Sequence, residues 1–141
     1  DPKTNIVFDW NEILNMEGNS GPYLQYTVAR CNSVIFKGPT LQGSTFKGLE
    51  RLNLNSEELS VLRKLSQFHE VIVTAAKSYS PNLLCNYLYD LAQKYNGFYN
   101  KHKIISDSGH LQNFRLLLTK TTGQVLKNGL KILGIQAPER M

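Results

Sequence analysis

Apolar residues recur along this chain at steps of three and four, which is the spacing of amphipathic helices. The clearest run comprises Leu59, Leu62, Leu65, Phe68, Ile72 and Ala75 or Ala76. Just before it, Asn55 or Ser56 precedes the acids Glu57 and Glu58. This order is typical of a capped helix start, because side-chain oxygens and negative charge both stabilise a helix N-terminus. We therefore expect one helix of about five turns over residues 56–76.

The neighbouring helices are predicted from their start residues as well as their spacing. Ser80-Pro81 predicts an N-cap followed by a proline at the first helical position, and the apolar stripe that follows reaches Phe98. Gly21-Pro22 predicts in the same way a helix that extends through Ile35. A shorter helix from Asp9 to about Met16 is expected before it.

The last helix is expected after a turn at residues 106–109. Its buried face is predicted to carry Leu111, Phe114, Leu118, Val125 and Ile132, and its opposite face to carry Lys120, Lys127 and Lys131. Gly134 is suited to end it in the left-handed conformation, which leaves residues 135–141 as a short extended tail.

The fold predicted is an all-α bundle of four to five helices. Residues 37–55 hold several Gly, Pro, Ser and Thr residues without a period, and we expect a long surface loop there. A length of 141 residues with 41% hydrophobic and 19% charged residues fits one globular domain and excludes disorder as the main state. No apolar stretch approaches the ~18 residues of a membrane-spanning helix.

Charge is distributed unevenly along the chain. Residues 1–90 carry eight basic and nine acidic residues, whereas residues 91–141 carry eight basic and two acidic ones. Such an excess indicates either a surface that faces a polyanion or a basic face kept for solubility. The two cysteines, Cys31 and Cys85, show no metal-site or disulfide spacing, which favours a reducing compartment.

No catalytic constellation can be assembled from these residues. His69, His102 and His110 are expected to be exposed structural histidines, and no glycine-rich phosphate loop is present. We therefore expect this chain to hold no catalytic site, metal or cofactor of its own. Because it begins with Asp1 rather than Met, we expect it to be part of a longer protein.

Two segments have the character of a recognition surface. Residues 17–26 place a polar turn and two tyrosines at a helix start, a combination that suits phosphate and stacked bases. The alternative is an ordinary helix cap with the tyrosines packed inward. Residues 98–103 interleave aromatic rings with positive charge, as single-stranded nucleic-acid sites do. The alternative here is that Phe98 faces the core and Tyr99 lies at a helix end.

Several blocks in order resemble the C-terminal part of arginyl-tRNA synthetases. They are Gly18–Tyr26 with Ala29-Arg30, then Phe98-Tyr99-Asn100, then Leu126–Ile135, and finally Ala137–Met141. The resemblance covers nearly all of the chain except residues 37–55. Phe8-Asp9-Trp10 with Glu12 resembles the segment that follows a class I catalytic domain. The resemblance as a whole implies a connecting segment over residues 1–16 and a DALR-type anticodon-binding domain over residues 17–141.

The resemblance also implies a function. The parent would be an arginine–tRNA ligase that uses ATP with Mg, and this domain would hold the anticodon stem-loop of tRNA(Arg). The class I signatures of the His-x-Gly-His and Lys-Met-Ser-Lys type are absent, so adenylation is expected in a preceding catalytic domain. Asp90-Leu91-Ala92-Gln93 stands where the family's tetrad is expected but departs from its order and lacks its Arg. A cytoplasmic monomer without membrane contact is expected.

Two other functions remain open from the residues. One is the DALR-type domain of the glycyl-tRNA synthetase β subunit, against which the terminal Ala137–Met141 block argues. The other is a protein–protein module whose basic face meets an acidic partner.

The residues expected to bind RNA come from both the resemblance and the placement of charge. The resemblance implies the turn and helix start near residue 20, Tyr99 and Met141, while the lysines follow from charge alone. The full set is Asn19, Ser20, Gly21, Tyr23, Tyr26, Arg30, Tyr99, Asn100, Lys101, Lys103, Lys127, Lys131, Arg140 and Met141.

Overall fold

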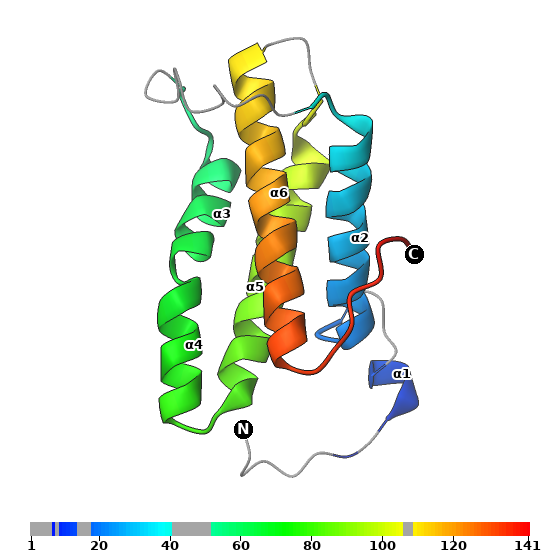
Figure 1. Ribbon diagram of the computed structural model, residues 1–141, viewed down its shortest axis with the longest axis vertical. Coiled ribbons are helices and arrows are strands. Elements are labelled where there is room, and N and C mark those ends of the chain that lie inside the picture. Colours follow the sequence, from blue (N-terminus) through cyan, green and yellow to red (C-terminus); the bar gives the residue numbers. More distant parts are fainter. Residues whose placement is uncertain (1–6, 8, 14–17, 41–51, 106–108) are drawn as a thin grey trace.

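Apart from a short N-terminal helix, the helices of the chain stand side by side with their axes nearly parallel (Figure 1). The computed structural model describes residues 7, 9–13, 18–40, 52–105 and 109–141. Within these residues the elements are α1 (Trp10–Ile13), α2 (Gly21–Lys37), α3 (Ser56–Ser66), α4 (Phe68–Lys77), α5 (Pro81–Lys101) and α6 (Gly109–Ile132). No strand occurs in the described part, and the prediction of an all-α bundle is confirmed.

The chain runs up along α2, down through α3 and α4, up along α5 and down along α6 (Figure 1). The described ends of the predicted loop, residues 38–40 and 52–55, are not helical, but Lys37 belongs to α2. The rest of that loop, residues 41–51, lies outside the described residues, as do residues 14–16 of the predicted first helix.

The prediction of one helix over residues 56–76 is wrong, because the helix is interrupted at Gln67. Here the Gln67 N–H donates to the carbonyl of Lys64 at 3.2 Å, in a tighter turn than the α-helix. The Tyr87 hydroxyl donates to the same Lys64 carbonyl at 2.8 Å, and Ser66 Oγ donates to the carbonyl of Arg63 at 2.9 Å. Side-chain donors therefore satisfy carbonyls at the point where the helical ladder stops.

The helix ends follow the predicted caps with one exception. Asn55 Oδ1 accepts from the Glu58 N–H at 2.8 Å, and the Glu58 carboxylate accepts from the Asn55 N–H at 2.9 Å, which forms a capping box. Gly134 ends α6 with φ 76°, as predicted. Ser80 stands at the N-cap of α5, but its hydroxyl donates to the carbonyl of Ser78 rather than capping the helix.

The core lies around α5, which contacts α2, α3, α4 and α6. Its fully buried side chains include Leu88, Leu91, Tyr95 and Phe98, so the core-facing alternative for Phe98 is correct. Ile132, expected on the buried face of α6, is instead 58% exposed. The predicted positions 118, 125 and 132 are seven residues apart, and a seven-residue step drifts by about 20° around a straight helix.

Candidate nucleic-acid interface

A groove of about 1080 Å³ runs along α2 between the end of α5, α6 and the C-terminal tail. Seven of the fourteen residues predicted to bind RNA line it: Tyr26, Arg30, Tyr99, Lys103, Lys127, Arg140 and Met141. The other described residues along it are Ala29, Asn32, Ser33, Val34, Phe36, Lys37, His102, Ile104, Ile105 and Glu139. The groove thus joins segments from both ends of the sequence.

One helical stripe forms part of the α2 side of the groove. Tyr26, Arg30, Ser33 and Lys37 follow one another at steps of three and four, so they project from the same face of α2. Ser20 begins this helix, since its hydroxyl accepts a hydrogen bond from the Tyr23 N–H at 3.3 Å. The cap therefore sets where the stripe begins.

Arg30 contacts two aromatic rings of the groove. Its guanidinium carbon lies 4.7 Å from the ring centroid of Tyr26 and 4.7 Å from that of Tyr99. Nη2 of Arg30 also donates to the Tyr26 hydroxyl at 2.8 Å. Because a guanidinium over an aromatic face is an attractive contact, Arg30 joins α2 to the end of α5 and holds the Tyr99 ring in place.

Asn96 fixes Arg30 from beneath the groove. Its Oδ1 accepts from Nη1 of Arg30 at 2.7 Å, and its Nδ2 donates to the Tyr23 hydroxyl at 2.9 Å and to Thr27 Oγ1 at 3.1 Å. Asn96 is buried, so each of these bonds satisfies a polar group that water does not reach freely. Sequence reasoning missed Asn96; its only signal was a polar residue between the apolar positions 95 and 98.

Tyr23 belongs to this buried support rather than to the groove. Its ring packs edge-on against Tyr89 with the centroids 5.5 Å apart. The inward-packing alternative therefore describes Tyr23, whereas Tyr26 lines the groove.

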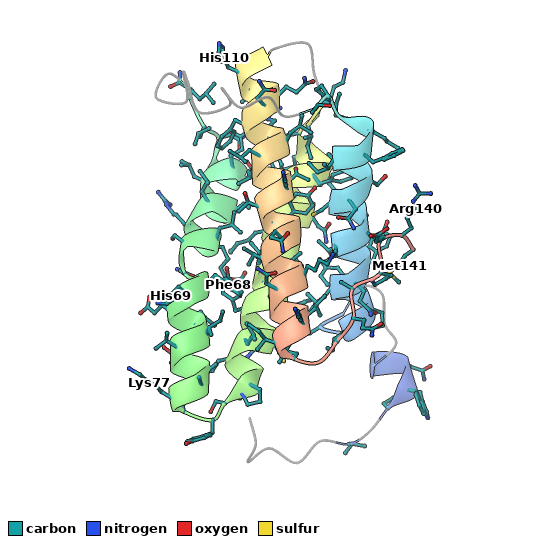
Figure 2. All side chains as sticks on the ribbon, viewed as in Figure 1. Phe68, His69, Lys77, His110, Arg140 and Met141 are labelled. Carbon is teal, nitrogen blue, oxygen red and sulfur yellow. The ribbon has the colours of Figure 1, made fainter. Side chains whose placement is uncertain are left out.

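The tail rises along α2 and forms one wall of the groove (Figure 1). Gln25 Nε2 donates to the carbonyl of Gln136 at 2.6 Å, and Asn32 Nδ2 donates to the carbonyl of Glu139 at 3.2 Å. These two bonds bring Arg140 and Met141 beside α2, as Figure 2 shows. Met141 is 62% exposed, so it is available to a ligand in the groove.

The remaining predicted residues do not line the groove. Asn19, Asn100 and Lys131 are exposed, and Gly21 starts α2. The ammonium of Lys101 lies 2.7 Å from the carboxylate of Glu57 on α3. Hydrogen bonds from Lys101 and Ser56 lower the pKa of Glu57 to about 2.

The histidines differ in exposure. His69 and His110 are exposed, as predicted (Figure 2). His102 is not: its side chain is 24% exposed, and its ring stacks on Phe98 with centroids 5.7 Å apart. Its Nε2 lies 3.4 Å from the carboxylate of Glu57. The prediction of an exposed His102 is wrong because α3 and the core close over the end of α5.

The described part of the chain has no metal-binding cluster. No cluster there of three or more His, Cys, Asp or Glu side chains could hold a metal ion. Burial raises the pKa of the Cys31 thiol to about 12, so it is a packed, inert group rather than a nucleophile. Among the helices that the structure describes, none has the length and apolar character needed to cross a membrane.

Comparison with known proteins identifies the family. The model of the DALR anticodon binding domain matches residues 24–141. The chain belongs to this family. The arginine–tRNA ligase of Clostridium botulinum (strain Alaska E43) is 40% identical over 138 residues, which cover 96% of this chain and 24% of that protein. The enzyme of the same name from Pyrococcus furiosus is 37% identical over 145 residues, covering 99% and 23%.

Solved structures agree with these relatives. Thermus thermophilus arginyl-tRNA synthetase superposes with a TM-score of 0.88 at 32% identity, over 99% of this chain and 24% of that one. Arginyl-tRNA synthetase from Plasmodium falciparum gives a TM-score of 0.82 at 25% identity, over 98% and 24%. The resemblance to arginyl-tRNA synthetases is thus confirmed, and this DALR domain spans about a quarter of the length of the relatives it matches.

Proposed function

We propose that this chain is the anticodon-binding domain of an arginine–tRNA ligase. The observation that carries the proposal is the groove, where three Tyr or Phe rings, five Lys or Arg side chains and a flexible thioether converge on a surface with one acidic side chain among its described residues, Glu139. Proteins read RNA sequence chiefly from unpaired bases, which stack on aromatic rings while cations meet the phosphates. The names of the relatives favour tRNA(Arg) over the glycine alternative.

The proposal assigns roles to the predicted RNA-binding residues. The Tyr99 ring stacks on an unpaired base, and Met141 closes over a second part of the loop. Lys103, Lys127 and Arg140 neutralise phosphates. Outside the groove, Asn19, Asn100, Lys101 and Lys131 meet the RNA at its edges, while Ser20, Gly21 and Tyr23 set the start of α2 and support Arg30.

The chemistry of the ligase lies outside this chain in our proposal. A catalytic part would activate arginine with ATP and Mg and transfer it to the 3′ end of the tRNA. Residues 1–16 would connect that part to the anticodon-binding domain over residues 17–141. We propose a cytoplasmic monomer, since the family membership and the groove require neither a second copy nor a lipid surface.

The test is a titration of labelled anticodon stem-loops with this chain, followed by fluorescence anisotropy. The stem-loop of tRNA(Arg) should bind more tightly than that of tRNA(Gly), and binding should weaken steeply with salt because phosphate contacts release counterions. An acidic protein of similar charge serves as the competitor. Equal binding of the two stem-loops would refute the assignment to arginine, and preferential binding of the acidic protein would favour a protein-interaction module.

A further inference from the structure

Phe36 is an exposed aromatic residue inside the groove. It lies in the last turn of α2, and its side chain is 80% exposed although phenylalanine usually contributes to the core. Single exposed apolar residues are common and need no explanation by themselves. Phe36 differs from them in its surroundings, because it lines the same groove as Tyr99 and Arg30.

The surroundings of Phe36 are cationic. The guanidinium of Arg140 lies 5.6 Å from the ring centroid, within the range of a cation–π contact. Lys37 follows it directly and also lines the groove. An aromatic ring beside a cation in a concave surface is the arrangement with which proteins hold unpaired bases, whereas surfaces for protein partners are wider apolar patches.

Phe36 is too far from Arg30 to act on the same base. The two residues are six positions apart on α2, which corresponds to ~9 Å of helix rise. Stacked bases follow one another at roughly 3.4 Å. A base on Tyr99, whose ring contacts Arg30, therefore leaves Phe36 free for another base of the same loop.

We propose that Phe36 is a second stacking surface, which holds an unpaired RNA base different from the one on Tyr99. The inference rests on the proposed function, because it assumes that the groove binds an RNA loop. The base stacks on the ring face that Arg140 leaves open. Arg140 contacts the other face of the ring and binds a phosphate of the same loop.

The experiment compares three substitutions of Phe36 in this chain by stem-loop titration. Phe36→Ala should weaken binding of the tRNA(Arg) stem-loop about 5- to 150-fold, the range for one base–aromatic stack. Phe36→Leu keeps an apolar side chain without a ring and should lose nearly as much, whereas Phe36→Trp should bind at least as well as the wild type. Tyr79→Ala is the control, because Tyr79 is 88% exposed but lies at the turn between α4 and α5.

Abasic substitutions in the RNA loop identify the base. One abasic position should weaken the wild type but not Phe36→Ala, and it should differ from the position to which Tyr99→Ala becomes insensitive. Wild-type affinity of Phe36→Ala or of Phe36→Leu would overturn the inference. It would also be overturned if Phe36→Ala and Tyr99→Ala became insensitive to the same abasic position. Failure of the wild type itself to bind the stem-loop would instead refute the proposed function.

A double-substitution cycle separates stacking from support of the tail. If Phe36 acts only by holding Arg140, then Phe36→Ala adds nothing to Arg140→Gln, and the inference is overturned. A further loss in the double variant supports stacking. Thermal melting should show the same Tm for Phe36→Ala and the wild type, because the side chain is exposed.

Discussion

Arg30 is the residue on which the proposed base-binding surface depends. Its Nη1 is bound by Asn96 and its Nη2 by Tyr26, so the guanidinium plane is fixed by two hydrogen bonds at 2.7 and 2.8 Å. That plane contacts the Tyr99 ring, which is 37% exposed. One part of the ring is thus packed on a cation while the rest faces the groove. A base that stacks there meets a ring whose orientation is already set.

The first prediction tests this ring directly. Tyr99→Ala should weaken binding of the tRNA(Arg) stem-loop about 5- to 150-fold, since one base stack typically contributes ~1–3 kcal/mol. Tyr99→Phe should bind nearly as well as the wild type, because the ring face survives. Thermal melting of both variants is the control, since Tyr99 also lies near Tyr95, with centroids 6.4 Å apart. Equal binding by the alanine and phenylalanine variants would contradict stacking.

At the scale of helices, two glycines of α6 allow it to approach its neighbours closely. A Cβ at Gly129 would lie 2.4 Å from Leu88 Cδ2 on α5, and one at Gly123 would lie 2.9 Å from the Cβ of Cys31 on α2. Leu88 and Cys31 are both buried, so neither side chain has open space to move into. The two glycines therefore set the distances of α6 from α5 and α2, and with them the position of Lys127 beside the groove.

The second prediction concerns this close packing. Gly129→Ala should lower the free energy of unfolding by about 1–3 kcal/mol, because overpacking of the core outweighs the better helix propensity of alanine. Gly97→Ala is the matched control: Gly97 lies within α5, and nothing approaches its Cβ position within 4 Å. That variant should gain about 0.5–1 kcal/mol. Urea unfolding measures both, and a stable Gly129→Ala variant would show that the helices adjust.

The start of α3 is tied to the end of α5 by charge. Glu57 contacts the ammonium of Lys101 at 2.7 Å and the ring of His102 at 3.4 Å. Beside it, the buried carboxylate of Glu58 accepts a hydrogen bond from Nε of Arg115 on α6 at 2.7 Å. Arg115 in turn donates to the carbonyl of Lys103 at 2.8 Å. The acids of one helix start thus position the segment that carries Lys103 into the groove.

The third prediction follows from the pKa of Glu57. This pKa is about 2 in the folded chain against an ordinary value of 4.5. The ionised Glu57 carboxylate therefore stabilises the fold fully above pH 4.5, and this contribution is lost as the pH falls toward 2. Urea unfolding at decreasing pH should show this loss. Glu57→Gln should abolish the part of this loss that belongs to Glu57, whereas Lys101→Met should only reduce it, because the hydrogen bonds of Ser56 and His102 to Glu57 remain. If both variants lose as much stability as the wild type between pH 4.5 and 2, the loss belongs to other carboxylates.

For the molecule as a whole, the sequence predicted what local spacing controls. The helix faces, the capping box of α3 and the left-handed Gly134 each depend on a few adjacent residues. The break at Gln67 escaped prediction because both halves keep the same apolar face. Asn96 and Arg30 are 66 positions apart in the sequence, and Glu58 and Arg115 are 57 positions apart. The local spacing of apolar residues holds no information on such distant pairs.

Some of the residues that line the groove had been singled out from the sequence. Aromatic and basic residue types pointed to Tyr99, Lys103 and Arg140, all of which line it. Phe36 and Lys37 were missed, although they show the same adjacency of ring and cation that drew attention to residues 98–103. Charge placement alone could not separate Lys127, in the groove, from Lys131, outside it, because both are exposed residues on α6.

The final prediction uses that difference between lysines. If the groove holds RNA phosphates, Lys103→Ala and Lys127→Ala should each weaken binding of every stem-loop sequence and lower the magnitude of the salt slope by about 0.7–0.9. Lys131→Ala is the matched comparison, since it removes the same charge from the same helix one turn away, at the edge of the proposed RNA surface and outside the groove. Its salt slope should change less than that of Lys127→Ala. Equal changes in the two variants would mean that RNA responds to the overall charge of α6 and not to contacts in the groove.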